Sequence, residues 1–430
     1  MRDPILFRRD DTLNPETAVY WKDLLYRVTK IGTELEVAPP RGRPRPEFEE
    51  AVREALSPSG TLEALGPNGV LDVQTEHCGI ELRVIGRHPH FLTLQAQYRR
   101  IMDVLLTEGS RARPTCGLHF HILTPTLAEP VPEIVLANLW NMVRRYAPEL
   151  RFMSSTGRQR EGLCRRRNHN SHLEMVRLSP GNMHMADIQA RLKASRRVPE
   201  HQNFLNLEHI RFTPEGEVFP FHLEFRFPDA DLSATAVTAK TFLFLALLLK
   251  AVDLSQYGVI HVGKIEPWRR KITLLDWLSN NDGKLATSDT SRIDDQVIEE
   301  LRQGSYELLD FLAPALDRLT DGLALDVLWE LAQNPISLQR CAGYEWPDIE
   351  ARLASRLQTN DLGLDDTDRR LMQRIELGEW SQMASSESWQ WHAARELFLT
   401  PQELERRLSL IHKLRGVRWD ERRGTMVFTT

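Results

Sequence analysis

Four short segments of the chain alternate ionisable and apolar side chains, at residues 31–37, 79–84, 117–122 and 221–227. Because successive side chains of a β-strand point to opposite faces, each segment predicts a strand with one polar and one apolar face. Paired in one sheet, the four strands would form a polar wall over a buried apolar floor. The polar wall consists of the ionisable residues of these segments: Glu34, Glu36, Glu81, Arg83, His119, His121, His222, Glu224 and Arg226.

Further elements are expected around these segments. A stretch rich in proline and arginine at 39–46 separates a first strand at 28–38 from a helix at 47–57. The residues before the first strand are polar, and we expect a loose start there. The other expected elements are strands at 71–76 and 80–84, a helix of about 18 residues from Phe91, a helix at 130–146, a hairpin of 204–210 with 219–227, and a helix from Ser233 to about residue 252.

The pattern changes beyond residue 265, where alternation nearly vanishes and helical periods dominate. We therefore expect two domains, a mixed α+β domain at 1–265 and a mostly helical domain at 266–430. A small hairpin is expected at 417–428. The helices expected in the second domain lie at 293–316, 346–357, 366–377 and 401–414.

Composition and charge narrow the class of protein. The chain has 430 residues, 41% of them hydrophobic and 27% charged, which is typical of a globular protein with a sizeable core. Its formal net charge of −5 makes nucleic acid an unlikely partner, because binding to phosphates usually needs a basic excess. The four cysteines form no CxxC pair, so a reducing cytoplasm is expected. The most apolar run, 241–249, is shorter than the roughly 20 residues that span a bilayer, so we expect a buried core helix and no membrane association.

The side chains of the polar wall are suited to binding metal ions and phosphate groups. Glu34 and Glu36 stand on one strand face, where two carboxylates repel unless solvent or a cation separates them. Oxygen ligands with one imidazole, His119, suit Mg²⁺ or Mn²⁺. With Glu81 and Glu224 on other strands, the ligands suffice for two or three ions. Arg226 stands two residues after Glu224, where its guanidinium could hold a phosphate oxygen.

Three of these segments resemble motifs of the amidoligase family. Gly32-Thr-Glu-Leu-Glu36 resembles its GxExE strand, Cys116-Gly-Leu-His-Phe-His121 its cGxHxH segment, and Leu223-Glu-Phe-Arg226 its (T/I)EFR segment, in the same order. This family belongs to the glutamine synthetase and glutamate–cysteine ligase superfamily of carboxylate–amine ligases, which includes the ligase that attaches the small protein Pup. The resemblance implies an α+β domain with a glutamine synthetase-like curved antiparallel sheet and flanking helices. The concave face would bind ATP and two or three Mg²⁺ ions.

The resemblance also implies residue roles. Arg226 would contact phosphate, and His121 would lie beside the substrate. Asn206 matches an asparagine that often precedes the EFR strand, and an arginine-rich stretch supplies Arg158 or Arg160 as nucleotide or acyl-phosphate contacts. Glu34, Glu36, His121 and Arg226 are the candidate catalytic residues, and Glu76 is a weaker extra ligand. The implied metal ligands are Glu34, Glu36, Glu81, His119 and Glu224.

Two positions depart from the family pattern. Arg83 and the residues after it replace a serine-proline pair, and Asp231 stands where threonine or asparagine is more usual. These departures concern the acceptor pocket more than the metal site.

The implied activity is ATP-dependent formation of an amide or isopeptide bond through an acyl phosphate. The acid and the amine could be small molecules or peptides, and the helical domain could contact a protein partner. The base that takes the amine proton is not identified, with Glu76, Asp72 and His121 as candidates. Two alternatives remain at this point: a metal-dependent amide or isopeptide hydrolase on the same fold, and a scaffold protein that binds nucleotide without catalysis.

Overall fold

The structure, a computed structural model, describes residues 5–9, 11–57, 62, 69–84, 90–113, 116–127, 129–157, 205–206, 219–261, 295–320, 322–359 and 366–428. The chain divides into two compact units, Met1–Ala354 and Ser355–Thr430. Each unit is described by itself below.

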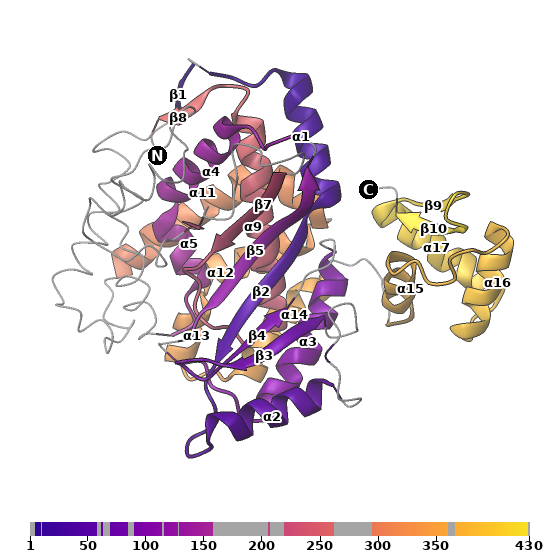
Figure 1. Cartoon of the computed structure of the whole chain (residues 1–430), viewed down its shortest axis with the longest axis horizontal. Helices are drawn as coiled ribbons and strands as arrows, with labels where there is room; N and C mark the ends of the chain where they lie inside the picture. Colours follow the sequence, from indigo (N-terminus) through magenta and orange to yellow (C-terminus); the bar gives the residue numbers. More distant parts are fainter. Residues whose placement is uncertain are drawn as a thin grey trace. The chain divides into compact units, whose positions relative to one another are not determined.

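A six-stranded sheet is the centre of the first unit (Figure 1). Its strand order is β3-β4-β2-β5-β7-β6, and every neighbouring pair is antiparallel. The predicted mixture of helices with an antiparallel sheet is thus confirmed. The strands are β2 (Lys30–Val37), β3 (Val70–Thr75), β4 (Ile80–Val84), β5 (Leu118–Leu127), β6 (Leu205–Asn206) and β7 (Phe219–Phe225).

The strand register brings the polar wall together on one face. Glu34 on β2 is paired with Arg83 on β4 and with His119 on β5. Glu36 is paired with Glu81. Because residues directly opposite each other in antiparallel strands share a face, these side chains all project from the same side of the sheet. The polar wall predicted from the alternating segments is therefore present.

The opposite face of the sheet is the apolar floor, and it packs on the long helix α9 (Ala234–Leu254). Phe120 and Phe225 are buried, and their rings lie 4.9 Å and 4.3 Å from the ring of Phe244 on α9. Helix α9 is long and apolar enough to pass as a membrane span, but 94% of its most apolar window is buried inside the protein. It is the core helix expected from the sequence.

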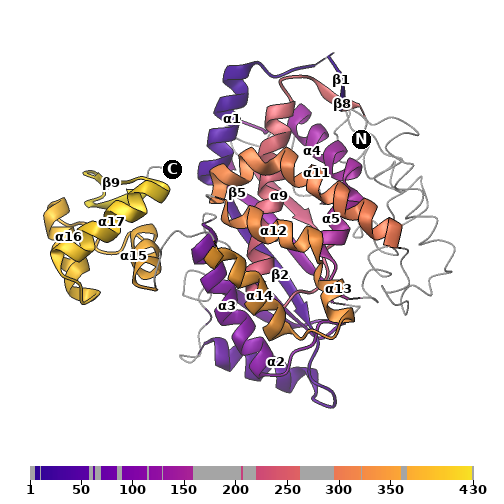
Figure 2. The same ribbon diagram turned by 180° about the vertical axis from the view of Figure 1, so that it is seen from behind.

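Other helices surround α9 on the side away from the polar wall. Helices α1, α3 and α4 pack against it, and α11 and α12 cover it from behind (Figure 2). In Figure 1 no helix of the described part of the chain lies in front of β2, β5 and β7, so the polar wall is on the uncovered face. These helices are α1 (Pro15–Val28), α3 (Phe91–Thr107), α4 (Glu133–Arg145), α11 (Asp295–Thr320) and α12 (Leu323–Gln333).

The first unit extends further along the chain than expected. The division predicted at residues 265 and 266 differs from the observed one, because α11 and α12 pack on α9. Leu308 and Leu312 of α11 and Leu328 of α12 are fully buried. Many of the helical periods after residue 265 therefore belong to the layer of helices that covers α9 in the first unit. The remaining elements of this unit are β1 (Leu6–Arg8), α2 (Arg45–Leu56), α5 (Ala147–Ser154), β8 (Val259–His261), α13 (Ile336–Cys341) and α14 (Trp346–Thr359), whose last turns pass into the second unit.

The start of the chain also differs from the expected loose segment, because residues 15–28 form helix α1. Asn14 caps this helix by accepting a hydrogen bond from the N–H of Thr17 at 2.8 Å, and Pro15 occupies its first turn. Ala18, Trp21 and Leu25 are buried at helical spacing. The apolar stripe and the cap therefore stabilise a helix here, despite the polar composition of this segment.

The second unit is small and mostly helical. It contains α15 (Asp366–Glu376), α16 (Ser386–Glu396), α17 (Pro401–Arg415) and the antiparallel strands β9 (Val417–Asp420) and β10 (Thr425–Phe428). Trp389 is fully buried at its centre, where its indole N–H donates to the hydroxyl of Thr425 at 3.2 Å. The hairpin predicted at 417–428 is confirmed.

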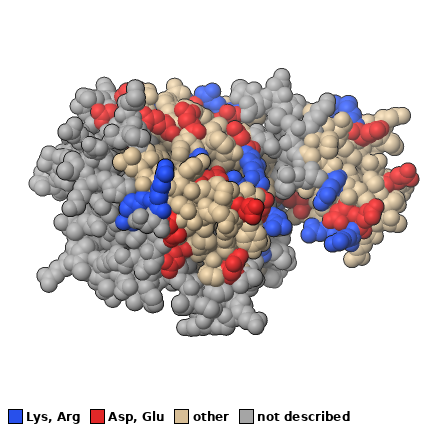
Figure 3. Space-filling model, turned by 90° about the horizontal axis from the view of Figure 1, so that it is seen from above, with Lys and Arg blue, Asp and Glu red and all other residues tan. Residues whose placement is uncertain are grey.

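Acidic and basic side chains are interspersed over the described part of the face drawn in Figure 3. Mixed charges of this kind are typical of an ordinary solvated surface. Over the described part of this face, lysines and arginines do not gather into one large patch.

Candidate metal site

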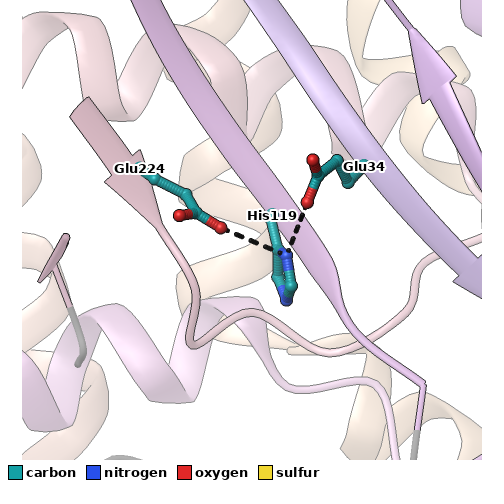
Figure 4. Close-up of side chains that lie close together, drawn as sticks. All are labelled: Glu34, His119 and Glu224. Carbon is teal, nitrogen blue, oxygen red and sulfur yellow. Dashed lines mark hydrogen bonds and ion pairs between the residues drawn. The ribbon is translucent and has the colours of Figure 1, made fainter. Parts of the chain in front are cut away.

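Three ligand atoms converge on the polar wall, one each from Glu34, His119 and Glu224, and all lie within 4.8 Å of one another. We call these residues the triad (Figure 4). The Nδ1 atom of His119 lies 3.1 Å from Oε2 of Glu34 and 3.3 Å from Oε1 of Glu224. His119 and Glu224 are buried, whereas the side chain of Glu34 is 25% exposed. Of the three side chains of the triad, that of Glu34 is thus the most exposed to solvent.

The sheet places the triad through its register. Glu34 and His119 are direct partners across β2 and β5. Glu224 is paired with His121, so it lies diagonally across from His119 on the same face. The neighbouring residues Leu35, Phe120 and Phe225 point into the core, and their burial fixes which side chains face outward.

The electrostatics keep both carboxylates of the triad ionised. Burial by itself would raise the pKa of Glu34, but hydrogen bonds and charge from His119 and His121 outweigh it and hold this pKa well below its usual range. Burial likewise opposes ionisation of Glu224, and the charges of His119 and Arg226 lower its pKa below the usual value. Ionised carboxylates are the form that binds a metal ion.

The donor set fits a small divalent cation. Two carboxylates and one imidazole offer three ligand atoms within 4.8 Å of one another, and water or substrate oxygens would complete the coordination of an ion. Such an oxygen-rich set with a single nitrogen suits Mg²⁺ or Mn²⁺. Glu34, His119 and Glu224 are the residues that would hold the ion.

The other two predicted ligands are held by donors of the chain itself. Glu36 accepts a hydrogen bond from the backbone N–H of Gly117 at 2.6 Å. Glu81 accepts from Nε2 of Gln74 at 2.9 Å and from Nε of Arg83 at 3.0 Å, both at its Oε1. Burial and the charge of Glu34 raise the pKa of Glu81. Among the described residues, only the triad brings three ligand atoms together.

Two histidines extend the wall beyond the triad. The Nδ1 atom of His121 lies 2.8 Å from Nε2 of His222, so the two rings share a hydrogen bond. The Nε2 atom of His121 lies 3.6 Å from Oε2 of Glu34. The alternation of residues 221–227 places His222 on the wall, although the sequence analysis assigns it no role in the site. The structure joins it to the predicted site residue His121.

Both arginines of the wall pair with its carboxylates. Arg226, the predicted phosphate contact, forms an ion pair with Glu224. Arg83, which the sequence did not assign to the site, contacts Glu81 and lies 3.9 Å from Oε1 of Glu34. The sequence places Arg83 two residues after Glu81, on the same strand face, and this spacing could have indicated that Arg83 belongs to the site.

The structure describes some of the remaining predicted residues and not others. Arg158 and Arg160 lie outside the described residues. The backbone of Asn206 pairs with Glu224 across β6 and β7. Glu76 lies in the turn after β3, where its carboxylate accepts from the N–H of His77 at 3.2 Å, and Asp72 is paired with Arg83.

Comparisons with known proteins give distant structural similarities. No family model matches the sequence, and no curated relative was found. One similar solved structure is the complex between the prokaryotic ubiquitin-like protein Pup and its ligase PafA, with a TM-score of 0.36 and 11% identity over 88% of this chain and 78% of that chain. Another is a novel glutamine synthase homolog, with a TM-score of 0.34 and 14% identity over 80% of this chain and 75% of that one. Both TM-scores are low, so neither similarity bears on the activity of this chain.

Proposed function

We propose that this chain is an ATP-dependent carboxylate–amine ligase with a divalent cation at the triad. One observation carries the proposal: each member of the triad comes from a different motif of the amidoligase resemblance. Glu34 belongs to GTELE, His119 to CGLHFH and Glu224 to LEFR. These motifs are far apart in sequence, yet their ligand atoms lie within 4.8 Å of one another on neighbouring strands.

The proposed reaction has two steps. A substrate carboxylate attacks the γ-phosphorus of ATP, giving an acyl phosphate and ADP. An amine then attacks the acyl carbon, phosphate leaves, and the amide forms with loss of the amine proton to a base. A bound divalent ion would neutralise charge on the transferring phosphoryl group.

The chain's own residues have two tasks in this mechanism. The triad fixes the position of the ion at the centre of the wall. Arg226 stands beside Glu224, and we propose that its planar guanidinium holds a phosphoryl oxygen of the nucleotide. Positioning and charge neutralisation of this kind are the main contributions of proteins to phosphoryl transfer.

Product analysis tests the proposal. The purified chain is incubated with Mg²⁺, ATP and pooled cell metabolites, and mass spectrometry searches for ADP together with a product whose mass equals an acid plus an amine minus water. We expect both signals, and we expect Glu34→Gln to abolish both. Glu54→Gln, the same substitution at an exposed position of α2, is the matched control and should leave both unchanged.

Two results would contradict the proposal in different ways. Cleavage of an amide without ATP would identify a hydrolase on this fold. Nucleotide binding without ADP release, in the presence of Mg²⁺ and the full metabolite pool, would identify a binding protein.

A further inference from the structure

The polar wall holds more carboxylates than one metal ion needs. Besides the two in the triad, Glu36 and Glu81 face each other across β2 and β4. Glu81 is only 6% exposed. A buried carboxylate beside another one is costly unless a positive charge accompanies it. The resemblance to amidoligases implies that further metal ions supply that charge.

In this chain a guanidinium occupies the position next to Glu81. The backbone of Arg83 is paired with Glu34 on one side and with Asp72 on the other. Its Nε lies 3.0 Å from Oε1 of Glu81 and 3.9 Å from Oε1 of Glu34. The positive charge therefore lies beside carboxylates from two adjacent strands, Glu34 on β2 and Glu81 on β4.

The remaining donors around these carboxylates also come from the protein. Gln74 donates to the same Oε1 of Glu81 that Arg83 contacts, and the backbone N–H of Gly117 donates to Glu36. These contacts lie at Oε1 of Glu81 and at Oε2 of Glu36, so donors of the protein already satisfy part of both carboxylates. Among the described residues, no group of three ligand atoms includes Glu36 or Glu81.

We propose that Arg83 takes the place of a second metal ion, so that the free protein binds a single divalent cation, at the triad. This inference rests on the proposed metal site. It differs from the two or three ions that the family resemblance implies, and the difference arises at a position where the sequence departs from the family pattern.

Manganese binding to the full chain, without nucleotide, tests the inference. Free Mn²⁺ is counted by electron paramagnetic resonance during titration of metal-stripped protein, which gives the number of ions bound and their affinities. We expect a single ion for the wild type, lost in Glu34→Gln. Glu81→Gln should leave the number of bound ions at one, because Glu81 is not among the three residues that would hold the ion.

Variants of Arg83 test whether its positive charge excludes a second ion. Arg83→Met removes the charge at similar length and should admit a second Mn²⁺ at Glu81. Adding Glu81→Gln to that variant should restore a single ion. Arg83→Lys keeps the charge and is the matched control, with a single ion expected.

Three results would overturn the inference while leaving the triad intact: a second ion in the wild type, a change in the number of bound ions on Glu81→Gln, or a single ion in Arg83→Met. An unfolded Arg83→Met leaves the first two results decisive. A wild type that binds no Mn²⁺ would instead overturn the triad, and with it the proposed function.

Discussion

The ammonium group of Lys240 lies 2.6 Å from Oδ2 of Asp231, and neither side chain is exposed to solvent. Asp231 follows β7, and Lys240 is on α9. The other carboxylate oxygen of Asp231 accepts a hydrogen bond from the N–H of Ser233, which caps α9. The ion pair therefore ties the segment after the wall arginine Arg226 to the core helix.

Removing one partner of this pair should destabilise the protein strongly. Lys240→Met leaves Asp231 buried without its counter-charge, and we expect a loss of about 3–5 kcal/mol in the free energy of unfolding. Urea denaturation followed by circular dichroism measures this value. Arg318→Met is the control, because Arg318 and Asp23 form an exposed pair at 2.7 Å, where a loss below about 1 kcal/mol is expected. Equal losses in both variants would contradict the expectation that losing one partner costs more in a buried ion pair than in an exposed one.

Arg226 should contribute to nucleotide binding more than to metal binding. Arg226→Met removes the guanidinium proposed to hold a phosphoryl oxygen, and we expect ATP affinity to fall about 10- to 100-fold, the usual effect of losing a charge-assisted contact. Mn²⁺ affinity should change little, since Arg226 is not a ligand. Isothermal titration calorimetry with ATP and with Mn²⁺ separates the two. A larger loss for Mn²⁺ than for ATP would show that Arg226 acts through Glu224.

Tyr98 should make the protein less stable at alkaline pH. Tyr98 is buried, with its hydroxyl donating to Thr33, and burial raises its pKa to about 12. The unfolded value is about 10, so deprotonation favours the unfolded state, and the stabilisation is lost as pH rises from about 10 to about 12.

Between pH 8 and about pH 11, the wild type should lose about 1.4 kcal/mol more unfolding free energy than Tyr98→Phe. Urea unfolding at both pH values measures the difference. The same loss in the two proteins would mean that Tyr98 titrates normally in the folded state.

Gly79 should resist substitution because of the strand beside it. A Cβ atom at Gly79 would overlap the carbonyl oxygen of Val37 and lie 2.7 Å from the Cα of Ala38, both backbone atoms. We expect Gly79→Ala to cost about 2–4 kcal/mol and to lower Mn²⁺ affinity, since β2 must move away from β4. Gly157→Ala is the control, because nothing lies within 4 Å of its added Cβ. A stable Gly79→Ala with unchanged Mn²⁺ affinity would contradict the expectation.

The strands of the wall were predictable because alternation is a local signal. The burial of Phe120 between the outward-facing His119 and His121 follows directly from the period of two, whereas the pairing of Glu34 with His119 is a matter of register. The role of Arg83 was not predictable, because only the register shows that its guanidinium lies between Glu81 and Glu34.

The division of the chain could not be derived from periodicity either. The apolar faces of α11 and α12 look alike whether they build a separate domain or cover α9, and only the packing distinguishes these cases. The same holds for α1. Its cap at Asn14 and its apolar residue Trp21 can be recognised in the sequence, but the helix against which it packs cannot. Helices are local features, and what they pack against is not.

Phe120 has a consequence for how this protein can change during evolution. It is anchored against Phe244 while the residues on either side of it, His119 and His121, face outward. An insertion or deletion of one residue within β5 would exchange these orientations, exposing a phenylalanine ring and driving an imidazole into hydrocarbon. Length variation in this protein should therefore be confined to its connecting loops, and the spacing within β5 should persist even where neighbouring sequence diverges.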